Sequence, residues 1–248
     1  MRSFKLTIAY DGTEFVGWQR QATGVSIQGL LEEALGVLDG RDVAVVGAGR
    51  TDAGVHAIAQ VAGVTLERDI DAPTLVRAVN ARLPPTIRVT DASEAPPAFH
   101  ARFNARAKTY RYRIWNAEVM NPFERAYAWH IPSPLLDERA MADAAHVVEG
   151  RHDFAAFQGA GTEPHSTERT VFRSELVRHD GLITYEISGD GFLRHMVRNI
   201  LGTLVDAGRG RLPPSGMADV LASRDRARAG KTAPAEGLFL VGVEYDYN

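Results

Sequence analysis

The feature that most constrains the fold is an order of elements that the sequence pattern gives twice. Each half reads as strand, helix, strand, strand, helix, strand, from the spacing of its apolar residues. In the first half these segments, with their capping residues, are 4–10, 26–40, 43–46, 55–66, 71–83 and 87–90. In the second half they are 109–115, 137–150, 170–178, 182–188, 192–208 and 238–245. Pro96 and Pro97 mark the connector between the halves.

This repeated order is that of split β-α-β, or ferredoxin-like, domains. We therefore predict an α+β protein of two such halves, at residues 1–104 and 105–248, and we take the later part of the ambiguous segment 55–66 as a strand. Two abutting sheets would form one continuous, mainly antiparallel sheet with helices packed on one face. A central active-site cleft is expected where the halves meet.

The composition, with 45% hydrophobic and 24% charged residues, is that of a globular protein and excludes disordered, collagen-like and disulfide-stapled chains. The net charge of −3 argues against histone-like binding of nucleic acid, but it leaves a local basic patch open because it averages over all faces. Without cysteine there is no disulfide, thiolate zinc site or cysteine nucleophile. Because no signal-like segment and no apolar run of about 18 residues occurs, we expect a cytoplasmic protein with no membrane contact.

The apolar run at 43–46 leads into Gly47 and Gly49, which is how a dinucleotide-binding fold begins. Glu67 even lies where an acid that binds the ribose would be expected. However, Asp52 occupies the position of the third glycine, and its carboxylate would repel a pyrophosphate. No clear helical stripe follows it. The sequence therefore disfavours a nicotinamide or flavin enzyme.

Asp52 lies between two glycines, directly after an expected buried strand, so its side chain could be presented to a cleft. The plainer interpretation is an ordinary turn in which Asp52 hydrogen-bonds its own backbone, and the spacing alone favours that interpretation. A free carboxylate is ionised at neutral pH, so it could also act as a nucleophile or general base. Arg50 could keep the carboxylate ionised or reach for a phosphate.

A second segment of interest is 102–113, which holds five cations and no acid, with Phe103, Tyr110 and Tyr112 among them. In a strand the two tyrosines share one face with Lys108, whereas the neighbouring arginines share the other face. Aromatic rings among arginines suit base stacking and phosphate contact in RNA. An exposed strand with a core-facing tyrosine explains the pattern equally well.

The remaining cationic residues carry weaker signals. None of the eight histidines shows metal-binding spacing, and a structural or phosphate-contact role is favoured for His100 and His195. The basic stretch, defined as residues 224–231, is expected to be a solvated surface run, with contact to RNA as the alternative. Its cations are Arg224, Arg226, Arg228 and Lys231.

Residues 49–56 (GRTDAGVH) resemble the signature of the tRNA pseudouridine synthase A family. Further segments match the other motifs of that family in order along nearly the whole chain. These segments are 10–12, 17–21, 99–103, 110–112, 195–199 and 235–238.

The resemblance implies an isomerase that converts uridine to pseudouridine at positions 38–40, in the anticodon stem-loop of tRNA. In this family the N–C glycosidic bond breaks, the base turns, and the base is rejoined to the ribose through carbon. The resemblance further implies no cofactor, no metal and no small-molecule cosubstrate. It also implies a homodimer in which one tRNA reaches across both subunits.

Position by position, the resemblance makes Asp52 the nucleophilic aspartate, and attack on the ribose or on the base both remain open. Tyr110 matches the tyrosine that packs on the target uracil, and Arg50 matches an arginine that helps to expel this base. Arg198 matches an arginine that pairs with the aspartate. Because an unpaired buried charge is costly, a partly buried Arg198 paired with Asp52 would place the active site between the halves.

The alternative function is a non-catalytic RNA-binding module, because ferredoxin-like sheets also bind RNA. That interpretation leaves Asp52 unexplained, since a bare carboxylate repels a polyanion. An Asp52→Asn variant separates the two functions, because it should abolish turnover and spare RNA binding.

Overall fold

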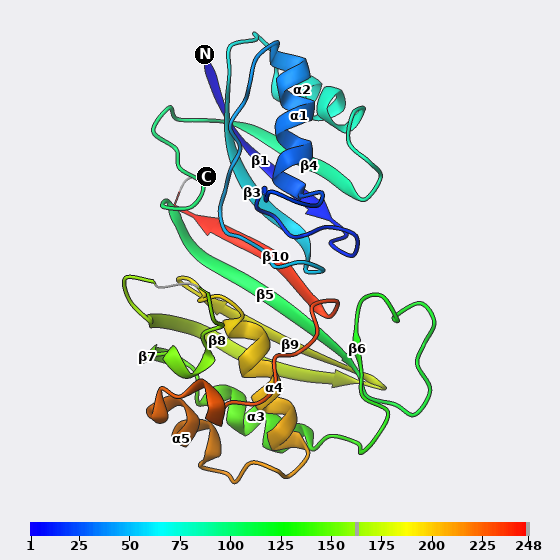
Figure 1. The fold of residues 1–248 in the computed structure, drawn as a ribbon, viewed down its shortest axis with the longest axis vertical. Helices are drawn as coiled ribbons and strands as arrows, with labels where there is room; N and C mark the ends of the chain where they lie inside the picture. The colour runs from blue at the N-terminus through cyan, green and yellow to red at the C-terminus, as the bar shows by residue number, and fades with distance from the viewer. Residues whose placement is uncertain (162–163, 247–248) are drawn as a thin grey trace. The chain divides into compact units, whose positions relative to one another are not determined.

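The computed structural model describes residues 1–161 and 164–246, and its contacts divide the chain into two units (Figure 1). Unit 1 is Met1–Arg106 together with Phe239–Asn248, and unit 2 is Ala107–Leu238. Both units combine helices with mostly antiparallel strands, which confirms the α+β class. The last strand of the chain counts with unit 1, whereas the division expected at residue 104 assigned it to the second half.

Unit 1 contains most of the strand and helix segments expected for the first half. Its elements are β1 (Arg2–Tyr10), α1 (Ile27–Asp39), β2 (Val46–Gly47), β3 (His56–Leu66), α2 (Ala72–Asn80), β4 (Ile87–Ala95) and β10 (Leu238–Tyr245). Strand β1 is central and pairs antiparallel with β3 on one side and β4 on the other, while β10 runs parallel to β3. Helices α1 and α2 lie side by side next to these strands (Figure 1).

The core of unit 1 follows from the alternation of apolar residues along β1. Phe4, Leu6 and Ile8 are fully buried, whereas the residues between them are not. The helices begin where capping was expected, because Ser26 accepts a hydrogen bond from the backbone of α1 and Asp71 does so for α2. Helix α2 ends at Asn80, three residues before the apolar pattern does.

The strand expected over residues 43–46 is reduced to the two residues of β2. Val43 and Val45 are buried as the pattern indicates, yet only Val46–Gly47 pairs with β3. The edge of β3 is divided, with β2 beside Ala62 and Gly63 and β10 beside His56 and Ala57. No helix follows Gly47, which agrees with the rejection of a dinucleotide-binding fold.

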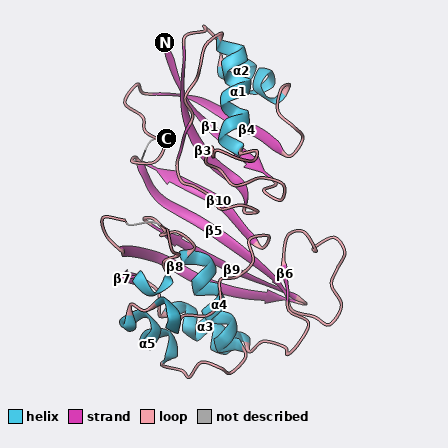
Figure 2. Ribbon diagram, in the orientation of Figure 1, coloured by secondary structure: helices cyan, strands magenta, loops and turns pink. Residues whose placement is uncertain are grey.

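Unit 2 holds the other elements of the chain (Figure 2). They are β5 (Ala105–Trp115), β6 (Trp129–His130), α3 (Glu138–His146), β7 (Gly150–Asp153), β8 (Glu168–His179), β9 (Leu182–Gly189), α4 (Met196–Gly208) and α5 (Gly216–Ser223), with short 3-10 turns at Ala155–Phe157 and Arg226–Arg228. Strand β9 lies between β5 and β8, antiparallel to both, and β7 pairs with β8. The expected β8–β9 hairpin at His179-Asp180-Gly181 is present.

Two differences in unit 2 have local causes. Helix α4 begins at Met196 and not at residue 192. His195 is its N-cap and has a left-handed backbone with φ of 59°, so the helix does not extend further towards residue 192. Helix α5 is short and was not expected from the sequence pattern. Within the described residues, no helix is both long and apolar enough to cross a membrane.

Candidate active site

Asp52 lies in the loop between β2 and β3, and this loop is attached to the rest of unit 1 by hydrogen bonds. The Thr51 carbonyl accepts a hydrogen bond from the Trp18 N–H at 3.1 Å, and the Thr51 hydroxyl lies 2.8 Å from that of Tyr10. The Val55 N–H donates to the Asp52 carbonyl at 3.1 Å, which closes a turn. The backbone that carries the partly buried Asp52 side chain is therefore fixed on both sides.

Gly17 allows the N-terminal segment to approach this loop closely. Its φ is +106°, and a Cβ atom at this position would come within 2.6 Å of the Thr51 carbonyl oxygen. The next residue, Trp18, is buried, and its backbone N–H donates the hydrogen bond to the Thr51 carbonyl. Residues 17 and 18 thus support the Asp52 loop, which gives a physical reason for a motif that the sequence resemblance only matched.

Tyr10 contributes a neutral hydroxyl to the same loop. Burial raises the pKa of Tyr10 to about 12, and hydrogen bonds with Thr51 and Gln60 offset part of this effect. The Gln60 amide also donates to the Gly49 carbonyl at 3.0 Å. Tyr10 therefore stays protonated at neutral pH and helps to fix the loop without adding charge.

Arg50 precedes Asp52 by two residues in the same loop, and its side chain is exposed. Within residues 1–161 and 164–246 it forms no ion pair. An exposed guanidinium next to a fixed carboxylate is free to contact a phosphate or to occupy the place of an extruded base.

Tyr110 lies in the middle of β5 in unit 2, opposite Ile187 of β9. Its side chain is only 8% exposed, and the ring of Phe192 meets it edge-on with centroids 5.3 Å apart. Tyr112 is buried on the same face, as the alternation along the strand predicts.

The opposite face of β5 carries arginines that are already neutralised. Arg111 pairs with Glu186 at 2.6 Å, and Arg113 pairs with Glu124 at 2.6 Å. Both acids lie outside segment 102–113, so its run of cations without acids is not a run of unpaired charges.

Arg198 lies on α4 and is held by the segment that leads into β10. Its Nε donates to the Ala233 carbonyl at 2.7 Å, and its own carbonyl accepts from the Ala233 N–H at 3.1 Å. The Tyr112 hydroxyl donates to the neighbouring Pro234 carbonyl at 2.7 Å. Arg198 therefore lies close to the face of β5 that carries Tyr110 and Tyr112.

Glu236 belongs to this group, although the sequence analysis gave it no role beyond a motif match. Burial raises the pKa of Tyr112, the Glu236 carboxylate raises it further, and Arg198 lowers it, so both charges lie near the phenol. Gly237 makes the arrangement possible, because a Cβ there would come within 2.5 Å of the Tyr112 ring.

The interpretation of residues 224–231 as a solvated run is wrong for Arg226. Its guanidinium is partly buried and donates to Asn199 Oδ1 at 3.0 Å, to the Thr232 hydroxyl at 3.1 Å and to the Gly230 carbonyl at 3.0 Å. Asn199 is fully buried and follows Arg198 directly on α4. Arg226 thus ties the residues next to Arg198 together, a tertiary role that the local charge pattern gave no sign of.

The predicted site residues therefore form two groups. Asp52 and Arg50 share one loop of unit 1, whereas Tyr110 and Arg198 both belong to unit 2. Among the described residues there is no group of three or more acids and histidines arranged to hold a metal ion. The unit 1 group combines a partly buried carboxylate with an exposed arginine, and the unit 2 group combines a buried tyrosine with a partly buried arginine.

Comparison with known proteins first gives the class. The model of a family described as tRNA pseudouridine synthase matches residues 6–104 and 144–246. This chain therefore belongs to the tRNA pseudouridine synthase family, whose members are isomerases. Asp52, Arg50 and Arg198 lie within the matched segments, and Tyr110 lies between them.

Individual relatives are similar over the whole length. The chain is 50% identical to tRNA pseudouridine synthase A of Solibacter usitatus over 248 residues, covering 99% of this chain and 100% of that one. It is 46% identical to tRNA pseudouridine synthase A of Pelobacter propionicus over 245 residues, again covering 99% and 100%. These alignments include the segment with Tyr110 that the family model leaves out.

Proposed function

We propose that this protein converts uridine to pseudouridine at positions 38–40 in the anticodon stem-loop of tRNA, with Asp52 as the nucleophile. The observation that carries the proposal is the Asp52 carboxylate, held on a loop by the Thr51–Trp18 and Thr51–Tyr10 hydrogen bonds in a chain of this family. A nucleophile held in one place avoids the entropic cost of finding its target in each turnover.

The reaction is an isomerisation that balances without an oxidant, reductant or cosubstrate. Asp52 attacks the target nucleoside at the ribose or at the base, and the bond between N1 and C1′ breaks. The uracil turns and C5 bonds to C1′, and the bond to Asp52 breaks, which returns the free carboxylate. The C5 proton is then lost and N1 gains a proton. Tyr110 packs on the turning uracil and assists the removal of the C5 proton.

The two arginines have separate tasks in this proposal. Arg198 pairs with Asp52 and keeps it ionised. This pairing rests on the motif match of Arg198, which lies within a segment that the family model matches. Arg50, which is exposed, fills the space that the extruded base leaves and offsets part of the lost stacking.

We further infer a cytoplasmic homodimer that binds one tRNA across both subunits, as the family resemblance implies. Sedimentation equilibrium tests this inference. A mass of twice the chain mass is expected, and it should persist at concentrations that support activity. A monomer at those concentrations would contradict it.

The proposed activity is tested by tritium release from tRNA that carries 5-tritiated uridine, with the native protein and Asp52→Asn compared. Release by the native protein and none above background by Asp52→Asn is expected, while the variant still binds tRNA. Equal release by both would remove Asp52 from the mechanism. No release by folded native protein that binds tRNA would favour the non-catalytic RNA-binding module.

A further inference from the structure

Residues 100–104 form a tight turn just before β5, and this turn is internally rigid. The Asn104 side chain accepts from the His100 N–H at 2.7 Å, and the Asn104 N–H donates to the His100 carbonyl at 3.0 Å. His100 Nδ1 accepts from the N–H groups of Arg102 and Phe103 at 3.2 and 3.3 Å. The backbone of the turn is therefore held by its own side chains.

The turn is also anchored to the body of unit 1. Ala101 is fully buried and packs with Ala48 and Val61. Its carbonyl accepts from the Tyr245 hydroxyl at 2.7 Å, and the Tyr245 ring lies 5.3 Å from that of Phe99. A turn whose backbone is fixed in this way loses less conformational freedom when it binds a partner, which lowers the entropic cost of binding.

One of the exposed side chains of this turn is an aromatic ring. Phe103 is 73% exposed, although burying a phenylalanine ring would be favourable. The His100 ring lies 4.3 Å from it and is tilted by 32°, and the Arg102 guanidinium lies 5.6 Å from its centroid. The ring is thus supported by an imidazole and a cation, and part of its surface is left to solvent.

The charge next to this ring is not neutralised by an ion pair within residues 1–161 and 164–246. Of the other arginines in segment 102–113, Arg106 pairs with Asp246, Arg111 with Glu186 and Arg113 with Glu124. Arg102 forms no ion pair with any residue that the structure describes. An exposed aromatic ring with an unneutralised arginine is complementary to a base and its phosphate.

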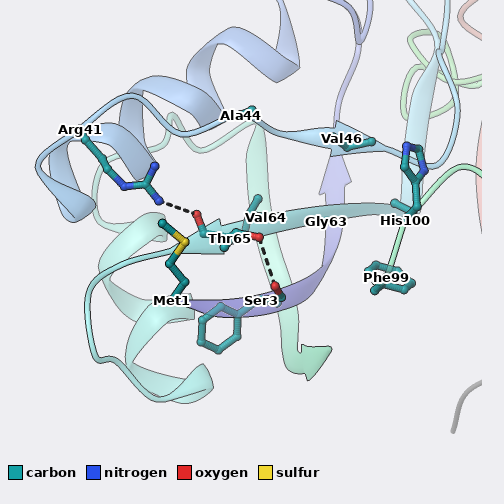
Figure 3. Close-up of a pocket in the computed structure, with 12 residues that line it drawn as sticks. Met1, Ser3, Arg41, Ala44, Val46, Gly63, Val64, Thr65, Phe99 and His100 are labelled. Carbon is teal, nitrogen blue, oxygen red and sulfur yellow. Dashed lines mark hydrogen bonds between the residues drawn. The ribbon is translucent and has the colours of Figure 1, made fainter. Parts of the chain in front are cut away.

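A neighbouring cavity lacks these properties. It measures about 350 Å³ and lies on the inner side of the turn, with Phe99, His100 and Gly63 among its lining residues (Figure 3). Its one arginine, Arg41, already donates to the Thr65 carbonyl and pairs with Asp39. The outer face of the turn therefore offers the better nucleic-acid contact.

We propose that Phe103, backed by His100 and Arg102, is a stacking site for an unpaired nucleobase of the tRNA substrate. Arg102 contacts the phosphate next to that base. The site rests on the proposed function for its ligand, and it adds a contact made by none of the four predicted active-site residues.

The test measures binding of an unmodified tRNA transcript by full-length protein in the Asp52→Asn background, so that turnover does not change the ligand. Phe103→Ala should weaken binding by about 5- to 150-fold, the range that loss of one base–aromatic stack gives. Phe103→Trp should bind within twofold of the parent, because any flat ring supports stacking. Phe103→Leu should behave like Phe103→Ala, because it keeps apolar area and loses the ring.

Phe123, which is 86% exposed in unit 2, provides the matched control, and Phe123→Ala should leave tRNA binding unchanged. Arg102→Gln should weaken binding and lower the slope of log K against log salt by about one, as for one lost phosphate contact. Binding by Phe103→Ala within twofold of the parent would overturn the proposal. So would native-like binding by Phe103→Leu.

A third result would also overturn the stacking-site proposal. If the native protein sediments as a dimer and Phe103→Ala sediments as a monomer, this turn is a subunit contact. The proposed function fails separately, through absence of tritium release by native protein. That result leaves the binding comparison between Phe103 variants intact.

Discussion

The loop that carries Asp52 and the segment that holds Arg198 are stabilised by different kinds of contact. Thr51, next to Asp52, is bound by the Tyr10 hydroxyl and the Trp18 N–H, both neutral, with close packing at Gly17. The residues next to Arg198 are tied together by a charged group, the partly buried Arg226 guanidinium. The first support depends on shape and the second on a charge, so different substitutions should disturb them.

The largest effect is expected from Gly17→Ala. The positive φ costs a residue with a Cβ about 1–3 kcal/mol, and the 2.6 Å approach to Thr51 adds an overpacking cost of similar size. We expect the free energy of unfolding in urea to fall by about 3 kcal/mol or more. The single-turnover rate constant should fall as well, because the displaced backbone belongs to the Asp52 loop.

Gly40→Ala is the control for that substitution. Gly40 also has a positive φ, of +75°, but nothing lies within 4 Å of a Cβ at that position. It should lose about 1 kcal/mol of stability from backbone strain and keep the native kcat. Equal losses of kcat in both variants would show that close packing at residue 17 does not position the loop.

The second effect concerns Arg226, the charged group that ties together the residues next to Arg198. Arg226→Gln removes the cation that serves the buried Asn199 Oδ1, and hydrogen bonds from charged groups contribute about 1.5–3 kcal/mol each. We expect a loss of about 2 kcal/mol in urea unfolding and a lower kcat. Arg228→Gln, at an exposed position two residues away, should stay within about 0.5 kcal/mol of the native protein. If the two variants behave alike, the charged support has no measurable role.

A smaller effect is expected from Tyr10→Phe, which removes only the hydroxyl that bonds Thr51. The loss of one buried neutral hydrogen bond should lower stability by about 1 kcal/mol, and kcat should fall with it. Tyr185→Phe removes a similar buried bond, 2.9 Å long to Ser174 in unit 2, and should leave kcat unchanged. A larger fall in kcat for Tyr185→Phe would contradict the assignment of Tyr10 to the loop.

A last effect is a change in alkaline stability. The pKa of Tyr10 is about 12 in the folded protein and about 10 in an unfolded chain, so the unfolded chain releases this proton first. Its contribution to stability is complete below pH 10 and is lost as the pH rises towards 12. The free energy of unfolding in urea, measured between pH 10 and 12, should fall less steeply with pH for Tyr10→Phe than for the native protein. The difference in slope should correspond to at most about one proton. An unchanged slope would contradict the burial of this hydroxyl.

Much of the fold was predictable because it is encoded locally. Ser26, Asp71 and Asp137 cap helices as expected, since a capping side chain acts on the backbone within three residues of itself. The alternation along β1 and β5 identified their buried faces for the same reason. The length of β2 was not predictable, because it depends on how β10, far along the chain, shares the edge of β3.

The candidate site divides in the same way. Asp52, Arg50, Tyr110 and Arg198 were identified from motifs in the sequence, and the Asp52→Asn variant tests the proposed role of the first. The contacts that support two of them were not identified. These are the contact of residues 17 and 18 with Thr51 and the bond of Arg226 to Asn199, and each joins residues at least 27 positions apart.

The sequence by itself determined the α+β class, the helix starts, the buried strand faces and the family, because these depend on residue type and short spacing. Only the tertiary structure decided which charges are neutralised. The cations of segment 102–113 look alike in the sequence, yet Arg106, Arg111 and Arg113 pair with acids from outside the segment. Arg102 lies beside Phe103, with no ion pair among the described residues. A charge is neutralised by whatever the folded chain brings within a few ångströms of it, and sequence spacing does not contain that distance.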